Sequence, residues 1–275
     1  MTNKTYPAKV TVPVILSSKT QSNPNPIAAV TAYDYTFAKL VDAAGVDIVL
    51  VGDSLGCVIQ GHPNTLPVTM DEMVYHTKCV SRAVERALVV ADMPFASYQL
   101  SNESAIANAF RFIKEGSAAA VKLEGGVAMF DTIKRIVDCD IPVMGHVGLT
   151  PQSYHRMGGF RVQGKDNSSK IFEDALAIAE AGAFSIVIEG VPDDLASRIT
   201  EAVKIPTIGI GAGIGCDGQI LVINDLLGLS DKKPAKFVKQ YANLFKPAVE
   251  AVSDFVDEVK SKKFPTAEFS YGRFQ

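Results

Sequence analysis

The sequence predicts an α/β protein of the TIM type, a (β/α)8 barrel with extra C-terminal helices. Eight short runs rich in Val and Ile recur along the chain, amphipathic stretches separate them, and 275 residues are close to the length of one such barrel. Continuous apolar runs of this kind are typical of parallel strands that are buried on both faces. We therefore expect a single barrel domain over residues 1–275, with a lead-in over about 1–26 and a helical extension over about 232–275.

Each expected strand leads into a polar residue or a glycine. In chain order, the expected strands are 27–33, 48–53, 88–93, 119–123, 142–147, 185–189, 207–210 and 220–223. Helical spacing of apolar residues predicts helices over 70–87, 102–114 and 171–181. Gly45, Gly116 and Gly182 precede strands and suit the left-handed C-cap of a helix. A doubly wound sheet of about six strands is the structural alternative, and two smaller domains also fit the length.

Composition and charge narrow the class of protein. The net charge is −3 and Lys and Arg are spread along the chain, so we expect no nucleic-acid partner. The four cysteines, Cys57, Cys79, Cys139 and Cys216, stand too far apart for a C-x-x-C clip, so neither a zinc site nor a disulfide framework is expected. The first ten residues lack the apolar core of a secretion signal, and every apolar run is too short to cross a membrane. These features predict a cytoplasmic protein.

Polar and ionisable side chains gather where the expected strands end. In β/α barrels the C-terminal ends of the strands face the active site. The residues at those ends are Asp34, Asp53, Ser54, Asp92, Lys122, Glu124, His146 and Glu189. Any one of them alone is more often a helix cap or a solvated loop residue, but so many at one face indicate an enzyme active site. A non-catalytic barrel that binds a ligand or a partner would not need them.

Two of these acids, Asp53 and Asp92, follow strands that are consecutive in the sequence. Two carboxylates with few other protein ligands suit a hard cation such as Mg²⁺, which keeps positions open for water and an oxygen-rich substrate. Glu124 could bind a water molecule that is coordinated to the metal, without itself being a metal ligand.

Three further residues are candidates for the chemistry. Lys122 either binds a carboxylate or enolate oxygen, or forms a Schiff base, or only pairs with a neighbouring acid. Glu189 follows an apolar run, so partial burial could raise its pKa toward that of a general base. His146 is a weaker candidate, because a lone histidine is as often a structural hydrogen-bond partner as a catalyst.

Two glycine-containing segments stand at the same end of the expected barrel. In residues 209–218, Gly213, Gly215 and Gly218 form a G-x-G-x-x-G pattern, but no clear helix follows, so the segment either holds a phosphate or lets the backbone turn. Residues 150–166 are long enough to be a lid over the barrel mouth, or an ordinary surface loop.

Taken together, these segments resemble the ketopantoate hydroxymethyltransferase family. The stretches that carry the resemblance are 31–34, 51–56, 92–95, 121–126, 145–152, 158–160, 162–164, the run that ends at Glu189, and 209–221. The likeness runs from about Thr11 to Pro265, with a looser entry to the first strand at 22–26 and with Phe269 where the family often has His.

The resemblance implies a barrel of the phosphoenolpyruvate/pyruvate type that uses Mg²⁺ and takes methylenetetrahydrofolate as one-carbon donor. The acceptor would be 3-methyl-2-oxobutanoate (α-ketoisovalerate), converted through a magnesium-stabilised enolate to 2-dehydropantoate in pantothenate and coenzyme A biosynthesis. It also implies a homo-oligomer, a decamer. The alternative is a related magnesium-dependent keto-acid mutase or carbon–carbon lyase on the same barrel.

The resemblance also assigns roles to residues. Asp53 and Asp92 would be metal ligands that also contact the substrate, with Glu124 as part of the metal site. Ser54 and Lys122 would hold the keto acid. Glu189 would be the catalytic base, and His146 a supporting residue.

Overall fold

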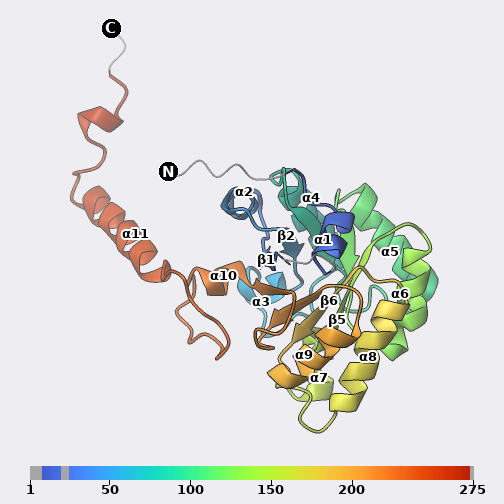
Figure 1. The fold of residues 1–275 in the computed structure, drawn as a ribbon. Coiled ribbons are helices and arrows are strands. Elements are labelled where there is room, and N and C mark those ends of the chain that lie inside the picture. Colours follow the sequence, from blue (N-terminus) through green and yellow to red (C-terminus); the bar gives the residue numbers. More distant parts are fainter. Residues whose placement is uncertain (1–7, 20–24, 273–275) are drawn as a thin grey trace. The chain divides into compact units, whose positions relative to one another are not determined.

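Eight parallel strands close into a barrel in the computed structural model, which describes residues 8–19 and 25–272 (Figure 1). Each strand pairs with the next in the sequence, and the last pairs with the first, from Ile27 opposite Gly218 to Val30 opposite Leu221. The predicted (β/α)8 barrel is confirmed, and the doubly wound alternative is wrong. The strands are β1 Ile27–Thr31, β2 Ile48–Val51, β3 Leu88–Asp92, β4 Ala120–Lys122, β5 Val143–Gly148, β6 Ser185–Glu189, β7 Thr207–Ile210 and β8 Gly218–Leu221.

Strand β8 differs most from its predicted position, because it begins two residues earlier than the expected run 220–223. Gly218 is its first residue, and a side chain there would lie 2.5 Å from the carbonyl oxygen of Ile27 on β1. The close approach of these two strands therefore requires a glycine, which an apolar pattern does not detect. Ile223, expected in the strand, instead begins a short helix.

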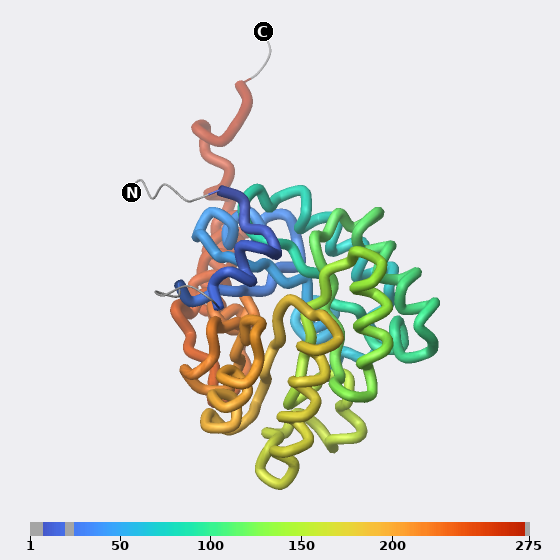
Figure 2. Tube along the Cα trace, turned by 45° about the vertical axis from the view of Figure 1, so that its right-hand side comes forward, coloured from blue at the N-terminus to red at the C-terminus, as the bar shows by residue number. Residues whose placement is uncertain are grey.

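Helices cover the outside of the barrel in chain order. The longer ones pack as neighbours, α2 with α4, α4 with α5, α5 with α6, α6 with α8, and α8 with α9, and α5, α6 and α8 lie side by side along one flank in both views (Figures 1 and 2). Their bounds are α2 Tyr35–Ala44, α4 Met70–Ser81, α5 Asn102–Lys114, α6 Phe130–Val137, α8 Ser168–Glu180 and α9 Asp193–Ala202. Shorter helical turns lie between them, at α3 Leu55–Val58, η1 Val127–Met129, η2 Pro151–Ser153 and α7 Tyr154–Met157.

Helix α4 starts where expected, behind a capping box formed by Thr69 and Glu72, but it ends at Ser81 and not at residue 87. The backbone N–H groups of residues 85–87 donate to the carboxylate of Asp42 on α2. Because that carboxylate replaces the carbonyl acceptors of a helical turn, the chain leaves the helix before β3 begins.

The predicted glycine caps are confirmed at two of three positions. Gly45 and Gly182 have φ of 88° and 96°, in the left-handed region. At the third position Ser117 adopts positive φ, 57°, instead of Gly116. Gly116 is needed for space, since a side chain there would lie 2.6 Å from the carbonyl oxygen of Phe112.

The lead-in contains a helix that the apolar pattern did not predict, α1 Val12–Ser18. Ile15 of α1 and the preceding Val10 belong to the same buried cluster as Ile27, Ile48 and residues of the other strands. Just after the helix, Lys19 donates to the carbonyl oxygen of Thr200 and to Asp217. These contacts place α1 against the apolar interior of the barrel. The irregular entry expected at 22–26 lies largely outside the described residues.

Residues from Ile223 onward form a second compact unit, separate from the barrel unit that ends at Val222. It contains α10 Ile223–Leu226, α11 Phe245–Lys260 and η3 Ala267–Phe269. The helical extension expected over 232–275 therefore contains one long helix, and residues 232–244 form none. A single domain over 1–275 stays a prediction. Across the described residues, no helix combines the length and apolarity that a membrane span needs.

Candidate active site

Five ionisable side chains lie at or just beyond the C-terminal ends of β2, β3, β4 and β6, as the sequence predicted. Asp92 and Lys122 are the last residues of β3 and β4 and are register partners. Asp53 and Glu124 stand two residues beyond the ends of β2 and β4, and Glu189 is the last residue of β6. Four of the five are buried and Glu189 is nearly so.

The shortest ion pair of the site joins Lys122 to Asp92, with Nζ 2.7 Å from Oδ1. The other oxygen of Asp92 accepts a hydrogen bond from the backbone N–H of Asp53 at 3.3 Å. Burial, and then the neighbouring Asp92 carboxylate, raise the pKa of Asp53 to about 7. Ionising all of these acids would therefore create negative charge that one lysine only partly balances.

Lys122 keeps its proton in this setting. Burial opposes the charge of its ammonium group, but the carboxylates of Asp92, Glu124 and Asp53 outweigh that effect and raise the pKa of Lys122 above its usual value. A protonated amine does not add to a carbonyl group, so the geometry favours ion pairing over the Schiff-base alternative.

His146 lies between two glutamates. Its Nε2 is 3.3 Å from Oε2 of Glu189, and its Nδ1 is 3.8 Å from Oε1 of Glu124. Neither ring nitrogen, nor Oε1 of Glu124, has a partner in hydrogen-bonding geometry among the described residues. Burial, and then the charge of Lys122, lower the pKa of His146 well below its usual value, so the ring is neutral.

Both glutamates of this group hold their protons more tightly than usual. Burial raises the pKa of Glu124 well above its usual value and that of Glu189 to about 8. A carboxyl group that titrates near neutral pH suits a general base, as the apolar run before Glu189 indicated.

Ser54 and Asp34, the remaining candidates, differ in position. Ser54 is half-buried beside the acids, and its hydroxyl lies 2.8 Å from that of Tyr33. Asp34 caps α2 by accepting a hydrogen bond from the backbone N–H of Phe37 at 2.9 Å, so the structure assigns it the helix-cap role.

Two residues that the sequence did not single out complete the polar network. Gln152 is buried, and its side chain donates to Asp53 Oδ2 at 2.9 Å. Tyr98 donates to Gln152 at 2.6 Å and accepts from the backbone N–H of Glu124. The pattern of acids at strand ends could not reveal them, because both lie in loops after strands, several residues beyond the apolar runs.

The glycine-rich segment 209–218 is not a dinucleotide site. Gly218, which completes the G-x-G-x-x-G pattern, begins strand β8, whereas in a dinucleotide site this glycine lies at the start of a helix. The backbone turn requires a glycine at position 213, because Gly213 has φ of 81° and a side chain there would lie 2.3 Å from Asp193. Phosphate binding by this segment stays a prediction.

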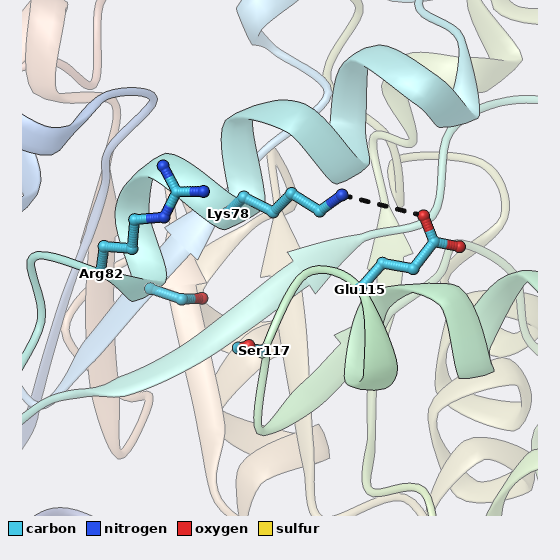
Figure 3. A pocket seen from close by; sticks show the side chains of 5 residues that line it. Lys78, Arg82, Glu115 and Ser117 are labelled. Carbon is cyan, nitrogen blue, oxygen red and sulfur yellow. Dashed lines mark ion pairs between the residues drawn. The ribbon is translucent and has the colours of Figure 1, made fainter.

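Figure 3 shows a pocket that is lined by other residues. It is lined by Lys78, Ser81, Arg82, Glu115 and Ser117, and Lys78 pairs with Glu115 at 3.9 Å. These residues stand at the C-terminal ends of α4 and α5 and just before β4, which is the opposite end of the barrel from the strand ends. None of the candidate residues lines it.

The chain is a β/α-barrel enzyme. It has buried acids, a protonated lysine and a neutral histidine at the C-terminal mouth of a parallel barrel, which is where such enzymes have their active sites. Phosphoenolpyruvate phosphomutase from Streptomyces platensis subsp. rosaceus has this fold at 16% identity, with a TM-score of 0.61 over 92% of this chain and 88% of that one. Phosphonopyruvate hydrolase in complex with oxalate and Mg²⁺ has it at 14% identity, with a TM-score of 0.59 over 92% and 90%. At such identities these structures show the fold alone.

The sequence model of ketopantoate hydroxymethyltransferase matches residues 9–267. The chain is also 58% identical, over 264 residues, to 3-methyl-2-oxobutanoate hydroxymethyltransferase of Pelobacter propionicus, which covers 96% of this chain and 97% of that protein. The chain therefore belongs to the ketopantoate hydroxymethyltransferase family. The resemblance stated from the sequence is confirmed.

Proposed function

We propose that the chain transfers a hydroxymethyl group from methylenetetrahydrofolate to 3-methyl-2-oxobutanoate, giving 2-dehydropantoate for pantothenate synthesis, with Mg²⁺ as cofactor. Family membership supports the acceptor and the reaction. The observation that carries the proposal is the cluster of Asp53, Asp92 and Lys122 beside Glu189, which combines anionic ligands, a fixed cation and a base at one barrel mouth.

The residues present fit a magnesium ion. Carboxylate oxygens are the ligands that Mg²⁺ prefers, and burial beside Asp92 makes the ionised form of Asp53 costly without a cation. Within the described ranges, no three His, Cys, Asp or Glu side chains are grouped so that they could hold a metal ion by themselves. An ion bound by Asp53 and Asp92 would therefore need water or substrate oxygens as its other ligands. Asp53 and Asp92 would hold the ion, and Glu124, whose Oε1 lacks a hydrogen bond, would support the site from nearby. When bound, Mg²⁺ supplies positive charge that stabilises an enolate oxygen.

Residues of the chain bind the substrate and accept its proton. Ser54 and Lys122 hold the keto acid, and the positive charge of Lys122 stabilises the negative charge that develops on the keto oxygen. Glu189 accepts the β-carbon proton, and the C–H bonding electrons form the enolate. As one carbon–nitrogen bond of the methylene bridge opens, the enolate carbon bonds to the methylene carbon, and the freed folate nitrogen keeps the bonding electrons and takes up a proton. Water then displaces the second folate nitrogen from that carbon; this nitrogen also leaves with the bonding electrons and takes up a proton, and the hydroxymethyl product is released. His146, whose Nε2 lies 3.3 Å from Oε2 of Glu189, is the supporting residue beside the base.

A paired assay tests the proposal. The protein should consume 3-methyl-2-oxobutanoate only with the folate donor and Mg²⁺, and it should exchange the β-proton of the keto acid with solvent. Cleavage of a carbon–carbon bond without folate would instead support the lyase alternative.

We expect the 150–166 loop to order over bound keto acid. The loop begins with η2 and α7, and Gly158 and Gly159 follow with φ of 66° and 107°. Arg156, Arg161 and Lys165 are exposed in it and are sites for trypsin. Keto acid with Mg²⁺ should slow trypsin cleavage after these residues, while cleavage after the exposed Lys236 should not change. Equal rates with and without ligand would contradict a lid.

We also expect a homo-oligomer, a decamer by the family resemblance. Helix α11 carries exposed apolar residues at helical spacing, among them Val249, Val252, Val256 and Val259, which are suited to contacts between subunits. Light scattering at micromolar concentration should report a mass several times the 29.4 kDa of one chain. A monomer would contradict the prediction.

A further inference from the structure

Both the nitrogen and the oxygen of the Gln152 side-chain amide form hydrogen bonds at the candidate site. It lies in η2, at the start of the 150–166 loop, and is 6% exposed. Its Nε2 donates to Asp53 Oδ2 and to the carbonyl oxygen of Met93, both at 2.9 Å. Its Oε1 accepts from the hydroxyl of Tyr98 at 2.6 Å and from Nε2 of Gln99 at 3.1 Å. All hydrogen-bonding positions of the amide are therefore filled.

The partners force the orientation of this amide. The Met93 carbonyl oxygen can only accept, so the NH₂ group must face it and Asp53 together. The Tyr98 oxygen already accepts from the backbone N–H of Glu124 at 3.2 Å, which leaves its hydrogen for Oε1 of Gln152. A reversed amide would place carbonyl oxygen against carbonyl and carboxylate oxygens.

The backbone of the same residue reaches a second acid. The N–H of Gln152 donates to Oε2 of Glu124 at 3.1 Å. The other oxygen of Glu124, Oε1, is buried and has no hydrogen-bond partner among the described residues. One residue thus fixes one oxygen of Asp53, after β2, and one oxygen of Glu124, after β4, on the two sides of Asp92 in β3.

We infer that Gln152 is a positioning residue for the metal site, because its side chain and its backbone N–H hold the carboxylates of Asp53 and Glu124 in fixed orientations. This inference rests on the proposed function, in which those acids serve Mg²⁺. Groups that orient metal ligands from outside the ligand set typically change metal affinity or activity by about 10–100-fold. Because Gln152 begins the 150–166 loop, it also ties the first turn of that loop to the metal site.

The test measures Mn²⁺ binding to the whole chain. The electron paramagnetic resonance signal of the free ion gives the amount of Mn²⁺ that is not bound. Gln152→Met keeps the length and approximate volume of the side chain but removes both donors and the acceptor. We expect its Mn²⁺ dissociation constant to rise by about 10–100-fold, measured well below the unfolding transition. The matched control is Gln163→Met in the same loop, whose amide donates only to the carbonyl oxygen of Arg161. The control should bind Mn²⁺ as the unsubstituted protein does.

A kinetic split separates positioning from a general loss of structure. For Gln152→Met, the Mg²⁺ concentration that gives half-maximal rate should rise, while kcat at saturating Mg²⁺ should recover toward that of the unsubstituted protein. An unchanged Mn²⁺ affinity, or a lowered kcat that Mg²⁺ does not restore, would overturn the inference.

Tyr98→Phe provides a second variant if Gln152→Met does not fold. It removes the hydroxyl that orients the Gln152 amide but leaves Gln99 in place, so Mn²⁺ affinity should fall by less than in Gln152→Met. Unchanged affinity in Tyr98→Phe would overturn the inference by itself. Mn²⁺ binding without transferase activity in the unsubstituted protein would refute the proposed function instead, so the two failures are distinguishable.

Discussion

Asp53→Asn should abolish Mg²⁺-dependent activity and yet make the metal-free protein more stable at pH 8. Asp53 is buried, and burial and the Asp92 carboxylate raise its pKa from the ordinary value of 3.8 to about 7. A carboxyl group with a raised pKa in the folded state favours folding most below pH 3.8, and this contribution is lost as the pH rises through about 7. An amide at this position carries no charge at any of these pH values.

Thermal unfolding in the presence of a chelator measures this effect. At pH 8 Asp53→Asn should unfold several degrees above the unsubstituted protein. The substitution removes the free-energy cost, about a few kcal/mol, of ionising a buried carboxyl group in the folded state. Near pH 3 the two should unfold at similar temperatures. Asp131→Asn, at an exposed position on α6, is the control and should change neither curve.

Mg²⁺ should reverse the order of stability. It should raise the unfolding temperature of the unsubstituted protein by binding the folded state, and raise that of Asp53→Asn little. The activity loss should exceed the roughly 10–100-fold expected for residues that only orient ligands. Equal stabilisation of both proteins by Mg²⁺ would remove Asp53 from the metal site.

Asp92→Asn should behave differently from Asp53→Asn. Asp92 is the nearest anion to the buried ammonium of Lys122, at 2.7 Å. Removing one partner of a buried ion pair typically costs about 3–5 kcal/mol. Asp92→Asn should therefore lose stability with and without Mg²⁺.

The sequence could predict the barrel and most of its charged site because both depend on local pattern. Parallel strands that are buried on both faces leave continuous apolar runs, and the first polar residue after such a run falls at the mouth, as at Asp53, Asp92 and Glu189. The position of an acid therefore follows from where its strand ends.

Contacts between segments that are distant in the sequence could not be predicted from local pattern. Gln152 donates to Asp53 across 99 positions of the sequence, and Gln152 is one of several polar residues in its own loop. The protonation of Lys122 depends on three carboxylates from three different segments, so the sequence left its role open. The position of β8 depends on how closely its backbone approaches Ile27, which only the closed barrel reveals.

Glu189→Gln should lose the exchange of the β-proton of 3-methyl-2-oxobutanoate with solvent by a factor on the order of 100 or more. The substitution keeps the shape of the side chain but removes the proton acceptor. Since Glu189 is not one of the proposed metal ligands, the variant should still bind Mg²⁺ and the keto acid. Hydrogen–deuterium exchange in D₂O, followed by NMR, measures this step without the folate donor.

The pH dependence and the neighbouring histidine distinguish a base from a residue that only orients others. Burial raises the pKa of Glu189 to about 8 in the metal-free protein, and a base works only when ionised, so exchange should fall as the pH decreases below the pKa that applies with Mg²⁺ and substrate bound. His146 is the alternative base. Its Nε2 lies 3.3 Å from Oε2 of Glu189, and its neutral ring can accept a proton. If His146 were the base and Glu189 only oriented it, Glu189→Gln would keep most of the exchange and His146→Phe would lose it. Glu201→Gln, on the exposed side of α9, controls for the loss of one carboxylate and should exchange at the normal rate.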